Sequence, residues 1–444
     1  MASCVSRGPR AARRRRWIAN LLLAIGAATL SSPFAQTQTL TLAQAEALAL
    51  KNHPQIAVAR NEAAVAGQQV VEAKSAYLPT VTGEVTGSQA LADSRLGAGF
   101  LTTSALFDRF GAGLELRQLV TDLGRTHNLV ASSKLQEQAA AQTVQATAFD
   151  VAMNVYGAYF GVLQAQAFVG VANETIHARQ TLADQVTALA NAQLKSQVDV
   201  SFAEVNLSEA KLLLIRAEDG VKKAYADLAR ALGEDNPVNY QLTEDAMPEA
   251  PPADAEALMT QAIQNRPELR ELRLRLQAAQ SFEAAERDLS RPDVTLLGVG
   301  GALPYLNQDP RIAPHDYEAL ALNINIPIFN GHLFSARREA AHYQSLAADQ
   351  RVRAIQQGVE RDVRSAWAGA QNAWQRIPVT QNLVKQAQLA LDLAQGRYKL
   401  GLASIVEVTQ AQLNLTQAQI ENVTARYDYH IAYAQLQYAI GALR

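Results

Sequence analysis

Residues 80–88 read Thr-Val-Thr-Gly-Glu-Val-Thr-Gly-Ser, so valine and glycine alternate with polar residues. Successive side chains of a β-strand point to opposite faces, and this run therefore predicts a strand with one apolar and one polar face. The same alternation recurs at 112–119, 294–300 and 320–326. Each run has roughly the length of a tilted membrane-spanning strand, and Thr, Ser and Asn supply much of the polar face.

The stretch between the strands of each pair predicts a loop. The first loop is the glycine-rich segment that ends at Phe110. The second contains Pro304, Pro310 and Pro314. Clusters of glycine and proline interrupt regular structure, which favours loops at both places.

Stretches rich in Ala, Gln, Val and Leu predict long helices outside these strand pairs. Residues 122–193 contain no proline, and a helix of that length would extend about 100 Å. The expected helices cover 40–76 with a break at Pro54, 122–193, 198–232, 255–290 with a break near Pro267, 331–400 and 404–443.

The pattern occurs twice. Pro54 and Pro267 are related by an offset of 213 residues, and Gly233 and Gly441 by an offset of 208. A nearly constant offset along the whole chain indicates a tandem duplication. We expect a first repeat at 36–233 and a second at 254–444, joined by a proline-containing linker at 234–253.

The N-terminal segment predicts a signal peptide at residues 1–35. Six arginines precede an apolar stretch from Ile18 to Leu30, which is too short to span a bilayer, and cleavage is expected after Ala35. The general secretory route is favoured. The single cysteine, Cys4, lies in this segment, so the mature chain is expected to have no disulfide and no lipid anchor on cysteine.

Composition argues against several functions. The chain has 40 Lys and Arg against 42 Asp and Glu, and six of the arginines fall within the signal, so nucleic acid is not an expected partner. The seven histidines show no metal-ligand spacing. No catalytic constellation is present, so we expect no enzyme activity, no metal and no cofactor. After the signal, no run of eighteen apolar residues predicts a transmembrane helix.

Four strands cannot close a barrel, for which about eight are needed. A bilayer also permits no open sheet edge. The strands therefore predict an oligomer in which several chains donate four strands each to one barrel. The alternative is a soluble β-subdomain on a helical bundle, in a periplasmic coiled-coil scaffold without a pore.

Several motifs, in order, resemble those of the outer membrane efflux protein family, the TolC-type exit ducts. The resemblance covers essentially the whole mature chain. The segments that carry it are 52–56 (Asn-His-Pro-Gln-Ile), 265–269 (Asn-Arg-Pro-Glu-Leu), 76–79 (Ala-Tyr-Leu-Pro), 326–331 (Ile-Pro-Ile-Phe-Asn-Gly), the weaker copy at 119–124, and 397–408 around Gly401.

The resemblance implies a mainly α fold with a β-barrel portion. Long helical hairpins would form a periplasmic α-barrel, and four transmembrane strands per chain would contribute to a shared trimeric 12-stranded β-barrel. The implied function is an outer membrane exit duct of a tripartite efflux or type I secretion system, which conducts substrates passively. The implied partners are two sister chains, a periplasmic adaptor, an inner-membrane transporter of the RND or ABC type, and outer membrane lipid.

The resemblance also places functional residues at the turns between paired helices. The periplasmic tip that meets the adaptor would comprise Gly401, Leu402, Ala403 and Ser404, with Leu194, Lys195 and Ser196 in the first repeat. Gln193 is the counterpart of Gly401, so the first turn must close without glycine.

A pore constriction is implied at Glu407, with Gln410 in the place of a second acid and Asp199 nearby. A ring of carboxylates favours cations. Polar gate links are implied at Asp199 and Tyr398. Ala403 occupies the place of the family's basic residue, and Arg397 is a candidate substitute. The alternatives are a helical hairpin without a partner and a solvated Glu407 that faces away from the pore.

Overall fold

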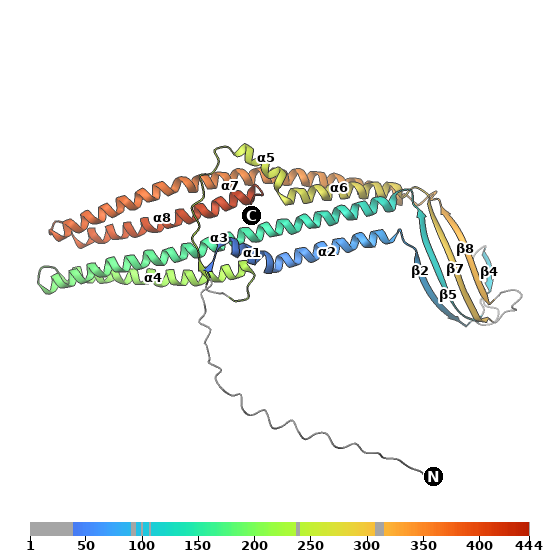
Figure 1. Ribbon diagram of the computed structural model, residues 1–444, viewed down its shortest axis with the longest axis horizontal. Coiled ribbons are helices and arrows are strands. Elements are labelled where there is room, and N and C mark those ends of the chain that lie inside the picture. Colours follow the sequence, from blue (N-terminus) through green and yellow to red (C-terminus); the bar gives the residue numbers. More distant parts are fainter. Residues whose placement is uncertain are drawn as a thin grey trace, which may run out of the picture.

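A four-stranded sheet lies at one end of an elongated molecule, and two helical hairpins reach the other end (Figure 1). This computed structural model describes residues 39–89, 95–98, 101–105, 108–236, 240–306 and 315–443. The predicted signal peptide lies outside the described residues, as do Pro310 and Pro314.

The helices form two sets that match in order and length, as the repeated sequence predicts. The first set contains α1 (Leu42–Asn52), α2 (Pro54–Ser75), α3 (Arg125–Asn191) and α4 (Gln197–Leu232). The second contains α5 (Ala255–Asn265), α6 (Pro267–Asp288), α7 (Leu333–Lys399) and α8 (Ile405–Ala439). Both α3 and α7 have 67 residues. Pro54 and Pro267 each begin a new helix, where the missing N–H costs no hydrogen bond.

The main sheet has the order β2-β5-β7-β8, and every neighbouring pair is antiparallel. Its strands are β2 (Thr80–Ser88), β5 (Arg109–Thr121), β7 (Asp293–Leu306) and β8 (Asp316–Asn325). All four strands predicted from the alternating pattern are confirmed. β2 and β8 are edge strands within this sheet and run in opposite directions.

Two predicted loops were partly wrong. The glycine-rich segment contains a short hairpin, β3 (Arg95–Ala98) with β4 (Leu101–Ala105). β7 continues through Pro304, which was predicted to lie in a loop. Ala302 pairs with Ala112 and Tyr305 with Phe110, so Pro304 falls at a bulge where the ladder is interrupted and its missing N–H is tolerated.

The linker contributes one element that the sequence pattern did not predict. β6 (Gln241–Leu242) pairs in parallel with β1 (Thr39–Leu40). The hydroxyl of the fully buried Tyr159 of α3 lies between the carbonyl oxygens of Leu40 and Thr243, at 2.9 and 2.8 Å, and shares its one proton between them. A two-residue pair carries too little periodicity to be recognised, although it fastens the linker to α3.

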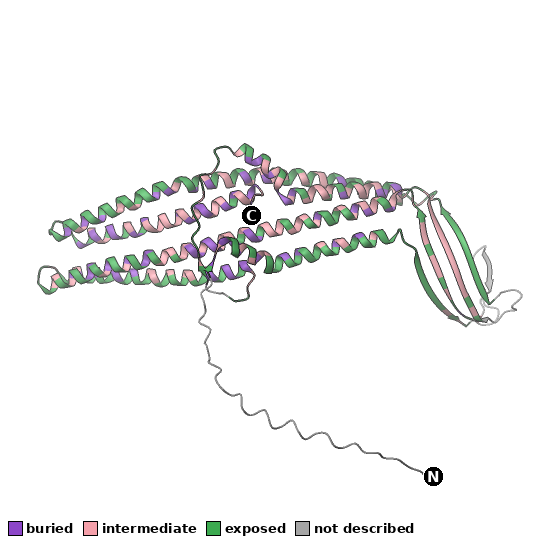
Figure 2. Ribbon diagram, in the orientation of Figure 1, coloured by how far each residue is buried: buried purple, intermediate pink, exposed green. Residues whose placement is uncertain are grey.

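The helical layer follows the order of the sheet. α2 contacts α3, α3 contacts α6, and α6 contacts α7, and each of these helices adjoins one strand of the sheet. In Figure 2 the buried residues lie mainly where helices face one another, and β2 and β8 are largely exposed. The sheet and this helical layer therefore both end in open edges on the same two sides.

The sheet places most of its large apolar side chains on one face. Val81 pairs with Leu116, Gly83 with Leu114, and Gly298 with Leu320. Partners that lie directly opposite each other share a face, so these residues form one apolar surface. The opposite face carries Thr82 and Glu115 on the first two strands. It carries Val299 and Ala319 on the last two, so it is less polar than the Thr, Ser and Asn pattern predicted.

Part of α3 is long and apolar enough to cross a bilayer, judged by length and composition alone. The candidate window has a mean hydropathy of 1.3, and 44% of it is buried within the chain. The sequence criterion of eighteen consecutive apolar residues did not detect it. α3 packs against α2, α4, α6 and α8. The apolar side chains of α3 therefore have partners in the protein, and the window is weak evidence for a spanning helix.

Candidate functional site at the hairpin turns

The turn between α3 and α4 closes with a pair of helix-ending hydrogen bonds. The N–H of Leu194 donates to the carbonyl of Leu189, and the N–H of Gln193 donates to that of Ala190, each at 2.9 Å. This arrangement is the Schellman motif, which requires a residue with positive φ. Gln193 supplies it with φ 60°, although a side chain makes this conformation unfavourable.

The turn between α7 and α8 repeats this geometry. The N–H of Leu402 donates to the carbonyl of Arg397 at 2.9 Å, and that of Gly401 to Tyr398 at 3.0 Å. Gly401 has φ 75°, which glycine adopts without steric cost. Both turns therefore close in the same way, and only the first is strained.

Gln193→Gly is expected to stabilise the first turn by roughly 0.5–1 kcal/mol, because it removes the left-handed strain at the cost of a more flexible unfolded chain. Gly401→Ala is the matched reverse change and should destabilise the second turn by about 1 kcal/mol. Hydrogen exchange at the turn amides measures both effects. Faster exchange in Gln193→Gly would contradict the shared turn geometry.

The two return helices begin differently. Ser196 and Asp199 form a capping box, in which the Asp199 carboxylate accepts from the Ser196 N–H at 3.2 Å. Glu407 occupies the position equivalent to Asp199, but Ser404 has no side-chain cap. Glu407 instead pairs with Arg397 at 3.5 Å.

Arg397 therefore links the two sides of its own turn. Besides Glu407, it donates to the carbonyl of Leu402 at 3.4 Å. The sequence suggested Arg397 as a gate link and Glu407 as a pore acid, and the structure brings the two together within one hairpin. Gln410 is exposed and donates to Asn414 at 2.9 Å.

Tyr398 lies where the two hairpins meet. Its side chain is buried, and its hydroxyl has no hydrogen-bond partner among the described residues. Burial raises the pKa of Tyr398, and the Asp199 carboxylate adds to the rise. Asp199 and Tyr398 are thus close without being hydrogen-bonded.

A basic side chain of the first hairpin lies against the Tyr398 ring. The Lys195 ammonium lies 4.2 Å from the centroid of the Tyr398 ring, in a cation–π contact between the first and second hairpins. Lys195 was predicted only as part of the adaptor-facing tip. The sequence could have indicated this contact, because Lys195 lies two residues after Gln193, in the first turn, and Tyr398 directly precedes the second turn.

A hydrophobic cluster holds the hairpins together behind the turns. Its members come from all four helices, and they include Val186, Val200, Tyr398 and Val408. Ala403 packs against this cluster. The turn residues Leu194 and Leu402 remain 70% and 67% exposed. The tip therefore presents apolar side chains to solvent from a rigid base.

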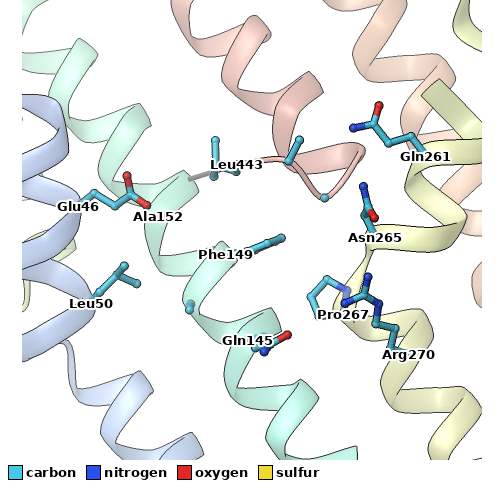
Figure 3. A pocket seen from close by; sticks show the side chains of 13 residues that line it. Glu46, Leu50, Gln145, Phe149, Ala152, Gln261, Asn265, Pro267, Arg270 and Leu443 are labelled. Atoms are coloured by element: carbon cyan, nitrogen blue, oxygen red, sulfur yellow. The ribbon is translucent and has the colours of Figure 1, made fainter. Parts of the chain in front are cut away.

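A second candidate site is a cavity of about 570 Å³ midway along the molecule. Figure 3 shows Glu46 and Leu50 on one wall, with Asn265 and Arg270 of the second repeat opposite. Burial raises the pKa of Glu46. No group of three His, Cys, Asp or Glu residues that could hold a metal occurs in the described part of the chain. The cavity contains no recognisable catalytic set.

This chain combines long helical hairpins with an exposed amphipathic sheet. These two features together place it in the class of outer membrane channels. The family model described as "Outer membrane efflux protein" matches residues 47–234 and 258–442. The chain belongs to the outer membrane efflux protein family. It is an outer membrane protein and acts as an exit duct in transport.

Curated relatives and solved structures agree with this assignment. The chain is 24% identical to outer membrane protein TolC of Salmonella enteritidis over 91% of this chain and 83% of TolC. It is 25% identical to outer membrane efflux protein BepC of Brucella suis over 93% and 88%. The Campylobacter jejuni CmeC outer membrane channel has the same fold, with a TM-score of 0.77, 18% identity, and coverage of 90% and 85%. The family assignment favours the exit duct over the alternative, a scaffold without a pore.

Proposed function

We propose that three copies of this chain close one duct, in which 12 strands form a barrel through the outer membrane and the helices form a cylinder in the periplasm. The observation that carries the proposal is the pair of open edges. β2 and β8 run antiparallel, so β8 of one copy can pair with β2 of the next. The open helical edges α2 and α7 lie on the same two sides.

The bilayer supplies the driving force for closure. An unpaired strand edge in hydrocarbon costs several kcal/mol per unsatisfied backbone group. The apolar face with Val81 and Leu320 would contact lipid, and the face with Thr82 and Glu115 would line the lumen. Each chain would contribute repeats at 36–233 and 254–444, joined by the linker at 234–253.

The tip would meet a periplasmic adaptor, which links the duct to an inner-membrane transporter of the RND or ABC type. Exposed Leu194 and Leu402, at equivalent positions of the two repeats, support this role. Gly401, Ser404 and Ser196 set the turns that present them. Energy for export would come from the transporter, because a duct has no energy-yielding step.

The pore constriction would lie at the same turns. Each chain brings Glu407 and its repeat counterpart Asp199, so a trimer carries two carboxylates per chain near the tip. The Glu407 side chain is 41% exposed and paired with Arg397, which leaves room for it to face the pore. Gln410 adds a polar side chain without charge.

Glu407→Gln is expected to lower the preference for cations over anions about fivefold, because one charge at close range in water contributes on the order of 1 kcal/mol. Reversal potentials in planar bilayers under a salt gradient measure the change. Glu218→Gln, an exposed residue of α4 far from the turn, is the control and should leave selectivity unchanged. Equal selectivity of Glu407→Gln and the wild type would contradict the ring.

A further inference from the structure

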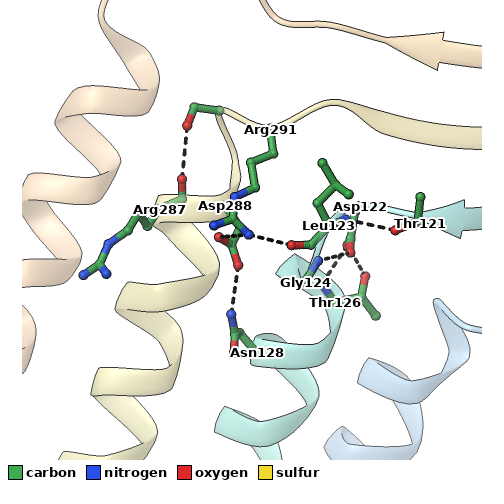
Figure 4. Close-up of polar contacts among 10 residues, drawn as sticks. Thr121, Asp122, Leu123, Gly124, Thr126, Asn128, Arg287, Asp288 and Arg291 are labelled. Atoms are coloured by element: carbon green, nitrogen blue, oxygen red, sulfur yellow. Dashed lines mark hydrogen bonds and ion pairs between the residues drawn. The ribbon is translucent and has the colours of Figure 1, made fainter.

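Within one chain, a polar clamp joins the two repeats where the sheet meets the helices (Figure 4). Asn128 of α3 donates to the Asp288 carboxylate of α6 at 2.9 Å. Arg291 pairs with Asp288 at 2.9 Å and donates to the carbonyl of Leu123 at 2.7 Å. The N-terminal end of α3 is thereby fixed to the C-terminal end of α6.

A second contact continues this junction along the helices. The buried hydroxyl of Ser132 donates to the carbonyl of Ala278 at 2.8 Å. Ala278 is 2% exposed. Small side chains allow α3 and α6 to approach closely here.

The repeat predicts where the same junction would form between two copies. α7 is the counterpart of α3 at an offset of 208, and α2 is the counterpart of α6 at an offset of 213. α7 and α2 lie on opposite open edges of the chain. The α3–α6 contact would therefore recur between α7 of one copy and α2 of the next.

The counterpart residues differ in chemistry from the clamp. On α7, Ala336 stands in the place of Asn128 and Ala340 in the place of Ser132. Both alanines are exposed. At the clamp positions, α7 therefore carries small apolar side chains where α3 carries polar ones.

The α2 edge is also less polar than the equivalent side of α6. Leu78 takes the place of Arg291, Ser75 that of Asp288, and Val65 that of Ala278. Leu78 and Val65 are 65% and 58% exposed, although their counterparts make interhelical contacts. Gln68 and Glu72 lie between them and keep this edge partly polar.

We propose that a second copy of this chain docks on this edge through an apolar seam, with Ala340 of one copy against Val65 of the next and Leu78 near the start of the neighbouring α7. The inference rests on the proposed trimer and specifies which residues of α7 and α2 lie opposite each other in neighbouring copies. The junction within a chain is made by hydrogen bonds from Asn128 to Asp288 and from Arg291 to Leu123. The junction between copies is instead packing of apolar side chains, which are those of Ala340, Val65 and Leu78.

The test uses cysteine pairs, because the only native cysteine is Cys4 in the N-terminal segment. Ala340→Cys with Val65→Cys is oxidised, or treated with a short bis-maleimide, in outer membranes. Most of the protein should then migrate on denaturing gels as covalent dimers and trimers. Ser132→Cys with Ala278→Cys is the matched control inside one chain, and it should lose its free thiols while the mass remains that of one chain.

A register control separates specific from random crosslinking. Val58 lies seven residues from Val65, about 10 Å along α2, so Ala340→Cys with Val58→Cys should crosslink at least fivefold less. Preferential crosslinking at Val58 in a protein of trimer mass would overturn the seam and leave the trimer intact. A single-chain mass in native mass spectrometry of the uncrosslinked protein would instead overturn the proposed trimer.

Discussion

Leu322→Arg should largely prevent this protein from accumulating in the outer membrane. Leu322 is 62% exposed on β8 and pairs with Leu296, on the face proposed to contact lipid. An arginine near the middle of the bilayer costs about 2–4 kcal/mol per chain. Three copies would carry about three times that cost, which is comparable to the net stability of about 5–15 kcal/mol that is typical of a folded protein.

The neighbouring residue provides the control for this prediction. Asn323 lies on the opposite face of the same strand and pairs with Thr295. Asn323→Arg should assemble normally, because lumen-facing positions tolerate charge. Membrane fractionation followed by quantitative immunoblotting measures both variants. If the two variants accumulate equally, or if Asn323→Arg is the defective one, the assignment of the faces is wrong.

Tyr398→Ala should loosen the tip and raise single-channel conductance. The ring is 5% exposed and packs in the cluster that joins both hairpins. Truncation of a buried aromatic residue costs about 3–5 kcal/mol, and loss of the Lys195 contact adds about 0.5–1 kcal/mol. The two hairpins would then be held together less firmly near their turns.

Tyr398→Phe separates packing from hydrogen bonding. It keeps the ring and removes a buried hydroxyl that has no partner among the described residues, so stability should be unchanged or slightly higher. Conductance and the rate of limited proteolysis at the turns should match the wild type. If Tyr398→Phe behaves like Tyr398→Ala, then the hydroxyl, and not only the ring, holds the tip together.

The parts of the fold that could be predicted from the sequence are the segments with a regular hydrophobic periodicity over many residues. The alternation at 80–88 and the long helical stretch at 122–193 each hold many residues of one periodicity, and both predictions were confirmed. β3 and β4 lie in a glycine-rich segment with little alternation. Pro304 was taken as a strand breaker, because a bulge that tolerates it depends on the partner strand.

The sequence alone predicted where the candidate site lies along the chain, but it did not predict which side chains contact each other there. The motif around Gly401 located both turns, and the offset of 208 identified Gln193 as a residue that must close its turn without glycine. The Lys195–Tyr398 contact joins residues 203 positions apart in the sequence, on different hairpins. Spacing along a single helix carries no information about such a pair.

The proposed trimer is tested most directly by native mass spectrometry of the protein extracted from outer membranes in mild detergent. We expect a single species with three times the mass of the mature chain. That species should dissociate when the edge strands β2 and β8 are prevented from pairing. A dominant species with the mass of one chain, in a sample that still conducts ions in planar bilayers, would contradict the shared barrel.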